Sequence, residues 1–211
     1  MKKTSDKILD TALRLFNSYG LSKVTLRTIA KEMGISQGNL NYHYKKRDDI
    51  IEALYFQLVK SIDETMASLM QNNSGQLNLK TMLSSSTHIM SDFYDYRFLF
   101  LDFVQVMREH KAIKAHYLKL GEMREVQFMG MFAFLIENKI MREEKFPNEY
   151  KYLYSRFQIL GDFWISSAEV MNKKITKETV NQYAFILSQS IYPYLTEKGE
   201  KEYQAIFSIQ V

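Results

Sequence analysis

A short segment near the N-terminus carries hydrogen-bonding side chains and no acids. Asn and Gln amides can pair with both hydrogen-bonding groups on the major-groove edge of adenine, whereas aromatic and hydroxyl groups can contact phosphate or the thymine methyl group. Ser36 precedes the segment, and its hydroxyl and the free N–H groups of a helix start could bind phosphate. These side chains favour contact with DNA. The segment comprises Gln37, Gly38, Asn39, Asn41, Tyr42 and His43.

Basic and hydroxyl residues flank this segment and are candidates to clamp phosphates. Residues 1–50 hold ten Lys or Arg and five Asp or Glu, a net charge of +5, whereas residues 51–211 hold eighteen and nineteen, a net charge of −1. Such asymmetry indicates a polyanionic partner for the N-terminal part, although an ordinary solvated surface could carry the same charge. The flanking candidates are Thr25, Arg27, Lys46 and Arg47.

Two short helices are predicted to position these residues. Thr25 caps a helix over Leu26–Met33, and Ser36 caps a second helix from about residue 37 to 44. Gly34 can take the positive φ that a three-residue turn between them needs. The pattern predicts a helix-turn-helix whose second helix is free to enter the major groove. The alternative is a small helical subdomain that binds protein.

The order of these signals resembles a known family. The stretch from Thr25 to Ile50, preceded by a helix over Ile8–Gly20 with an Ala-Leu-Arg-Leu-Phe core, resembles the DNA-binding domain of TetR-family regulators. The resemblance covers residues 4–54. It implies an all-α protein that binds operator DNA as a dimer and holds a small ligand in its C-terminal part.

One position of the second helix departs from the family pattern. Where the family usually has a tyrosine after the leucine, this chain has Asn41, and Tyr42 follows directly. Either Tyr42 takes over a phosphate contact, or Asn41 reads a base instead; the sequence leaves both open. Tyr44 and Arg47 replace the usual phenylalanine and lysine, and both changes are mild.

The whole chain is predicted to be all-α. Apolar residues recur at a spacing of 3.6, period-2 alternation is scarce, and only two prolines occur. We expect a three-helix domain over residues 1–50 and a helical bundle over residues 51–211 for dimerisation and ligand binding, with a long helix over about 48–71 linking them. Asn72–Gly75 breaks the pattern. Further helices are expected over about 77–95, 96–110, 112–142, 149–172, 177–195 and 198–208.

Two C-terminal segments are candidates for a dimer interface. Between residues 149–172 and 177–195, apolar residues recur at spacings of three and four, which suits packed helix pairs. Other faces of these helices are also apolar, so the helices must pack against more than their own core. The apolar residues on those faces are Ile159, Phe163, Ile165, Phe185 and Ile186. We expect a two-fold, four-helix interface. The interface residues chosen from the stripes are Phe157, Leu160, Trp164, Ala184, Leu187 and Ile191.

The middle of the chain is rich in Phe, Tyr and Met. Such side chains usually fill interiors. The alternative is an apolar cavity for a hydrophobic or amphipathic effector, with a few tyrosines and arginines for polar contacts. The candidate ligand-binding residues are Tyr94, Phe100, Phe103, Met107, Tyr117, Arg124 and Phe128.

Several classes of function lack any signal. Cysteine is absent, and the sequence has no Glu-x-x-His pair, glycine-rich phosphate loop or zinc motif. The spacing of His110 and His116 puts them on different sides of a helix, so neither a metal, a cofactor nor a catalytic site is expected. No apolar run reaches the ~18 residues of a membrane span, and the N-terminus has no signal peptide, so we expect a cytoplasmic protein without a membrane partner.

The predicted function is therefore DNA-binding transcriptional regulation. The hypothesis is a homodimeric repressor of a pseudo-palindromic operator, released by a small, hydrophobic effector of unknown identity. The alternatives are a constitutive or architectural DNA binder without an effector, and a helical-bundle enzyme, for which no catalytic constellation is found. Whether binding represses or activates is not given by the sequence.

Overall fold

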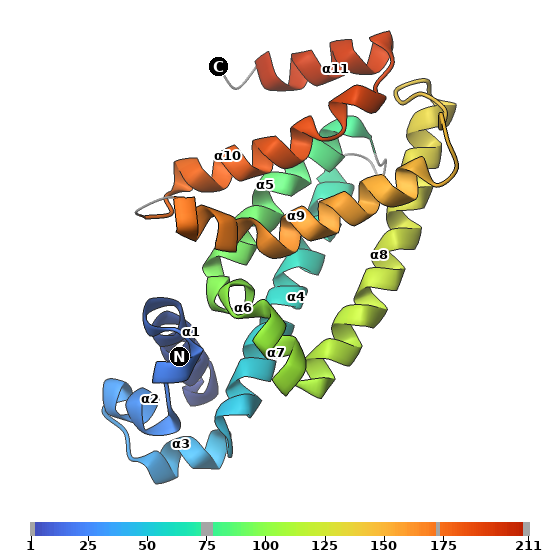
Figure 1. The fold of residues 1–211 in the computed structure, drawn as a ribbon. Coiled ribbons are helices and arrows are strands. Elements are labelled where there is room, and N and C mark those ends of the chain that lie inside the picture. The colour runs from blue at the N-terminus through green and yellow to red at the C-terminus, as the bar shows by residue number, and fades with distance from the viewer. Residues whose placement is uncertain (1–2, 73–77, 172–173, 209–211) are drawn as a thin grey trace. The chain divides into compact units, whose positions relative to one another are not determined.

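A computed structural model describes residues 3–72, 78–171 and 174–208 of the chain (Figure 1). Within these ranges the chain folds into helices and has no strand, which confirms the all-α prediction. None of the described helices is long and apolar enough to cross a membrane. Most of the predicted breaker, residues 73–75, lies outside the described residues.

The chain divides into two compact units. Unit 1 comprises residues 1–61 and 95–117, and unit 2 comprises residues 62–94 and 118–211. Helix α4 (Arg47–Asn72) begins in unit 1 and ends in unit 2, and helix α8 (Lys111–Glu137) does the same. The remaining helices of unit 1 are α1 (Thr4–Tyr19), α2 (Leu26–Met33), α3 (Gln37–His43), α6 (Arg97–Leu101) and α7 (Phe103–Glu109).

Unit 1 joins the N-terminal helices to a segment that is distant in sequence. The ring of Phe16 on α1 stacks on Phe98 of α6, with centroids 5.0 Å apart. The Asn17 side chain donates to the Asp95 carbonyl at 2.7 Å and accepts from the Phe98 N–H at 3.1 Å. These contacts explain why residues 95–117 belong to unit 1 together with the N-terminal helices.

Three of the predicted helices end earlier or are interrupted. The helix predicted over 112–142 is α8, which ends at Glu137. The segment predicted as one helix over 96–110 is divided at Asp102 between α6 and α7. The helix predicted over 177–195 is α10 (Lys177–Gln189), followed by a 3₁₀ turn at Tyr192–Tyr194 that contains Pro193, because proline lacks the N–H that an α-helix needs. The other helices of unit 2 are α5 (Leu79–Asp95), α9 (Glu149–Met171) and α11 (Glu197–Ser208).

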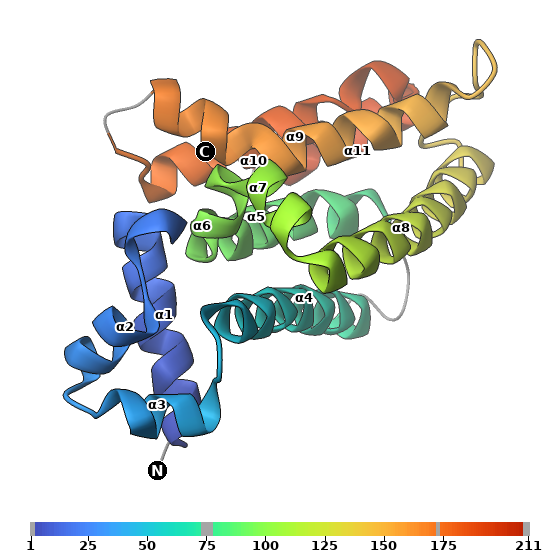
Figure 2. The same ribbon diagram turned by 60° about the horizontal axis from the view of Figure 1, so that its bottom comes forward.

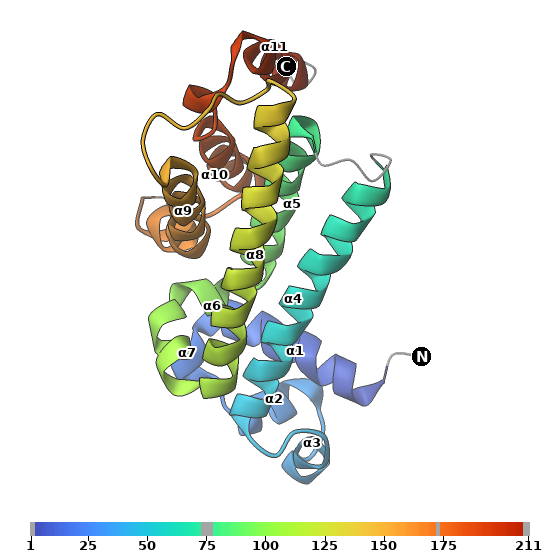
Figure 3. The same cartoon turned by 90° about the vertical axis from the view of Figure 1, so that its right-hand side faces the viewer.

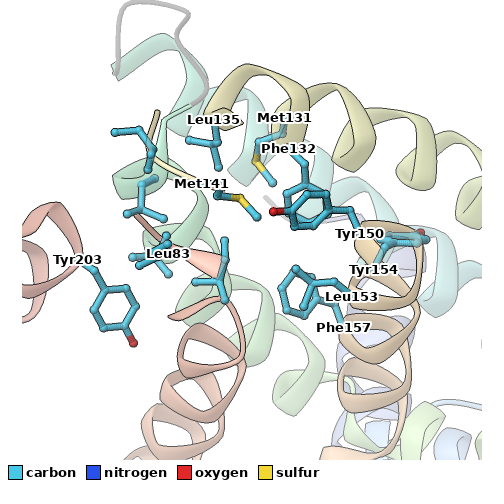
Figure 4. Close-up of a cluster of buried hydrophobic side chains, with 14 residues drawn as sticks. Leu83, Met131, Phe132, Leu135, Met141, Tyr150, Leu153, Tyr154, Phe157 and Tyr203 are labelled. Atoms are coloured by element: carbon cyan, nitrogen blue, oxygen red, sulfur yellow. The ribbon is translucent and has the colours of Figure 1, made fainter. Parts of the chain in front are cut away.

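The core of unit 2 is built mainly from aromatic and aliphatic side chains of α8 and α9. Figure 4 shows Phe132 of α8 facing Tyr150, Leu153 and Phe157 of α9, with Leu83 of α5 nearby. All five side chains are buried. Four residues of the middle segment are buried, as the simpler of the two interpretations predicts: Phe98, Phe100, Met131 and Phe132.

A buried ion pair fixes the connection between α8 and α9. Both terminal nitrogens of Arg142 donate to the carboxylate of Glu149, at 2.8 and 2.7 Å, and the backbone N–H of Lys145 donates to it at 2.8 Å. The hydrogen bond from Arg142 lowers the pKa of Glu149 to about 2, from an ordinary value near 4.5.

This ion pair gives stability a pH dependence. Because the folded-state pKa of Glu149 is depressed, its contribution is fully present above about pH 4.5 and is lost as the pH falls towards 2. We expect Glu149→Gln to lower the free energy of unfolding at pH 7 and to reduce its decline between pH 4.5 and 2. Urea unfolding at a series of pH values measures this, with Glu143→Gln, on an exposed side chain, as the control. Parallel pH curves for the wild type and Glu149→Gln would contradict it.

Candidate nucleic-acid interface

The predicted helix-turn-helix is present at α2 and α3. The side chain of Thr25 accepts from the Thr28 N–H at 3.2 Å, and that of Thr28 accepts from the Thr25 N–H at 2.9 Å, so α2 starts with a reciprocal capping box. Gly34 ends α2 in the left-handed region, with φ of 66°. Ser36 then caps α3 by accepting from the Asn39 N–H at 3.1 Å. Both predicted caps and the predicted glycine turn are confirmed.

A small apolar core holds α3 in place. Leu40 is the inward residue of α3, and Ile29 and Ala30 are the inward residues of α2; all three are buried. Since α3 has only seven residues, its position depends on this single buried leucine and on the short turn before it. Helix α3 lies at the lower end of Figure 3 and leads directly into α4 (Figure 2).

The remaining side chains of α3 form a polar outer surface. With about 100° between successive residues, Gly38 and Tyr42 lie opposite the buried Leu40. Gln37 and Asn41 share one flank, and the opposite flank is formed by Asn39 and His43. All of these residues are exposed, and Tyr42 has 86% of its surface accessible. The structure thus brings together the six candidates of the second helix.

The flanking candidates divide into exposed and anchored residues. Thr25, Arg27 and Lys46 are exposed. Arg47, by contrast, is only partly accessible, and its guanidinium donates to the Leu21 carbonyl at 3.1 Å. Arg47 therefore ties the start of α4 to the segment that follows α1, a structural role that nothing in the sequence pattern indicated.

Tyr44, the substitute for the family's phenylalanine, is turned inward. It is half-buried, and both this burial and the nearby Asp6 carboxylate raise the pKa of its hydroxyl. Tyr44 supports the fold of unit 1, whereas Tyr42, two residues earlier, projects outward.

The structure corrects the residues chosen for the dimer interface. Phe157, Trp164, Ala184 and Ile191 are buried in the interior of their own chain, and Leu160 and Leu187 are partly buried. A side chain that is already buried by its own chain has no surface left to bury against a partner. The three-and-four spacing of these residues identified the inner face of α9 and α10.

The opposite face of these helices is apolar and exposed. Helices α9 and α10 lie side by side in Figures 1 and 2, joined by the ring contact between Trp164 and Tyr183, whose centroids are 5.3 Å apart. Ile159 and Phe163, one turn apart on α9, have 62% and 44% of their surface accessible. The exposed apolar residues of the pair are Tyr152, Ile159, Phe163, Val170, Met171, Phe185 and Ile186.

The seven ligand-binding candidates are distributed over both units. In unit 1 the ring of Phe103 contacts Phe100 and Tyr117, with centroids 6.3 and 5.3 Å away, and Met107 is half-buried. The other three candidates belong to unit 2, where each of them already contacts other residues. The Tyr94 hydroxyl donates to the Ile175 carbonyl at 3.1 Å, Arg124 pairs with Asp63, and Phe128 packs against the core.

Family models match both parts of the chain. Residues 8–54 match the model described as bacterial regulatory proteins, tetR family, and residues 62–203 match the model described as bacterial transcriptional repressor. The first match contains all the helix-turn-helix residues described above, and the second covers most of the C-terminal helices.

Individual relatives and solved structures agree with the matches to these family models. An HTH-type transcriptional regulator of Staphylococcus aureus strain USA300 is 26% identical over 199 residues, covering 93% of this chain and 84% of that protein. The chain spans less than half the length of several other relatives. AcrR of Shigella flexneri, for example, is 32% identical over a stretch that covers 37% of this chain and 31% of AcrR. A TetR-family regulator from Marinobacter aquaeolei has the same fold, with a TM-score of 0.80, 21% identity and 97% of both chains covered.

Proposed function

Because the chain belongs to the TetR family of bacterial transcriptional regulators, and is thus a DNA-binding regulator and not an enzyme, we propose that it is a homodimeric repressor that a small hydrophobic effector releases from its operator. The observation that carries the DNA-binding part is the exposed polar surface of α3, held by the buried Leu40 and by two capped helix starts. In a helix-turn-helix, such a helix lies in the major groove.

The proposed dimer forms through the exposed apolar face of α9 and α10. This face supports the proposal because large apolar side chains exposed on one helix pair can mark an interaction site. Two copies of each helix would bury it as a four-helix interface. A dimer places its two reading helices about 34–36 Å apart, one turn of DNA, so we expect a pseudo-palindromic operator.

The proposed effector acts by shifting the population between two separations of the reading helices. Helix α6 contacts α1 through the Phe16–Phe98 stack and the Asn17 amide. A displacement of α6 would therefore be transmitted to the DNA-binding helices of unit 1. Structural neighbours include SmeT in complex with triclosan, at a TM-score of 0.58 and 14% identity over 93% of both chains. The candidate ligand-binding residues around Phe103 are aromatic, so their side chains would offer contacts to an apolar effector. The alternative is a regulator that binds constitutively.

Selection of bound duplexes from a random DNA pool tests the proposed function. We expect enrichment of a pseudo-palindrome, and we expect some hydrophobic compounds to weaken its binding. By reciprocal linkage, operator DNA should weaken compound binding by the same factor. Failure to enrich any sequence with folded, ligand-free protein would refute operator binding. Enrichment without any compound effect would favour constitutive binding.

The salt dependence of binding tests the proposed phosphate contacts. If Arg27 and Lys46 each neutralise one phosphate, we expect Arg27→Gln and Lys46→Gln each to reduce the slope of log K against log salt by about 0.9. Affinity should fall for all sequences alike. Fluorescence anisotropy at several salt concentrations measures the slope, with Lys119→Gln, an exposed lysine of unit 2, as the control. An unchanged slope for Arg27→Gln or Lys46→Gln would remove that residue from the interface.

A further inference from the structure

We propose that Asn41 reads an adenine base in each half-site and that Tyr42 makes the phosphate contact beside it. The proposal rests on the proposed function, namely that α3 lies in the major groove of operator DNA. It combines the two alternatives that the departure from the family's tyrosine left open: Asn41 reads a base, and Tyr42 takes over the phosphate contact. It also makes Asn41 a residue that sets this protein's choice of operator.

The first observation is the place of Asn41 on α3. Asn41 lies one turn after Gln37, so the two amides lie one above the other on the same flank of the helix. Gln37 is the first residue of α3, and the N-terminal residues of a reading helix are the ones that contact base edges. Asn41 lies on the same flank as this first residue, one turn further along α3.

The second observation is that both amides are available for DNA. Gln37 and Asn41 are exposed, and within the described part of the chain neither side chain has a hydrogen-bond partner. The side-chain amides of Gln37 and Asn41 thus keep their full donor and acceptor capacity.

The chemistry of the amide favours a base over a phosphate. An asparagine amide carries one acceptor oxygen and a donor NH₂ group, whereas a phosphate offers acceptors alone. A phosphate contact would leave the amide oxygen without a donor from the DNA. The major-groove edge of adenine offers an acceptor, N7, beside a donor, the N6 amino group, and so satisfies both halves of the amide.

Tyr42 has the opposite properties. It lies about 100° around the helix from Asn41, opposite the buried Leu40, and 86% of its surface is accessible. Its ring packs edge-on against His43, with centroids 5.3 Å apart and an interplanar angle of 85°. A long, rigid side chain that ends in a single hydroxyl can donate to a phosphate oxygen, as tyrosine side chains do in protein–DNA interfaces.

The spacing of the two amides predicts where the bases lie. Four residues of α-helix rise about 6 Å, and successive bases along one strand are about 3.4 Å apart. If α3 follows the groove, Gln37 and Asn41 contact bases about two steps apart. We expect two adenine-containing positions in each half-site, one dependent on each amide.

The test compares wild-type protein with Asn41→Ala, Gln37→Ala and Tyr42→Phe on every single base-pair substitution of the selected operator. We expect Asn41→Ala to lose a preference of roughly 5–150-fold at one position of each half-site, with all other preferences and the salt slope retained. Gln37→Ala should lose the base preference at the other adenine-containing position of each half-site. Tyr42→Phe should weaken binding to every duplex by a similar factor. Circular dichroism melting checks that the exposed changes leave the fold intact.

Two outcomes overturn the inference separately from the proposed function. If Asn41→Ala weakens all duplexes equally and keeps every base preference, Asn41 contacts the backbone and the inference is wrong, while operator binding stands. If Tyr42→Phe, and not Asn41→Ala, removes a base preference, the two roles are reversed. If the wild-type protein itself enriches no sequence, operator binding fails and the inference fails with it.

Discussion

Replacing Ile159 and Phe163 together by aspartate is expected to give a folded monomer whose operator affinity is lower by roughly 10²–10⁴-fold. Both side chains lie on the exposed apolar face of α9, so neither change disturbs the interior of the chain. In the proposed dimer the same face is buried, and unpaired carboxylates there are costly to desolvate. A monomer holds one half-site at a time and loses the effective concentration that the second half-site provides.

Analytical ultracentrifugation measures the oligomeric state, circular dichroism the fold, and fluorescence anisotropy the operator affinity. Val126→Asp is the matched control, because Val126 is an exposed apolar residue of α8, outside α9 and α10. We expect Val126→Asp to remain dimeric. A double variant that is still dimeric would rule out the α9–α10 face as the interface, and a wild-type protein that is monomeric would rule out the dimer itself.

Trp164→Ala is expected to lower the free energy of unfolding by about 3–5 kcal/mol. Trp164 has 1% of its surface accessible, and its ring packs against Tyr183 of α10. Truncation removes the largest fully buried side chain of the described residues and leaves a cavity between α9 and α10, which the surrounding helices can fill only in part.

Urea unfolding measures this loss, at one fixed protein concentration because the stability of a dimer depends on it. Val126→Ala is the control, since Val126 is an exposed residue of α8, outside the proposed interface, and its truncation should change the free energy of unfolding by about 0.5 kcal/mol or less. A loss for Trp164→Ala as small as that expected for an exposed side chain would show that Trp164 is not part of the core.

The substitutions at Ile159 and Phe163 test the outer face of α9, and the substitution at Trp164 tests its inner face. The apolar spacing in the sequence assigned Trp164 to a subunit interface, in which case a charged substitution would give a folded monomer. The structure places Trp164 inside its own chain, so we expect the same substitution to unfold unit 2. In the proposed interface, Ile159 and Phe163 take the place of Trp164. The apolar spacing of the sequence marked these two residues only as additional apolar positions.

The helix-turn-helix was predicted closely from the sequence. The caps at Thr25 and Ser36 and the left-handed turn at Gly34 involve hydrogen bonds and backbone angles within three or four residues. Such features depend on the local residue types, and the chain can adopt them in much the same way whatever surrounds it. The spacing of polar residues around Leu40 then determines which side chains of α3 lie outward.

Only the tertiary structure decided which side of α9 and α10 faces inward, and that residues 95–117 join the N-terminal helices. Phe16 and Phe98 are 82 positions apart in the sequence, and no local pattern connects them. A helix that is apolar on more than one face can turn any of them towards the core. The choice is made by the partners that burial brings from distant parts of the chain, because burial energy depends on the surface that is covered and not on the neighbours along the helix.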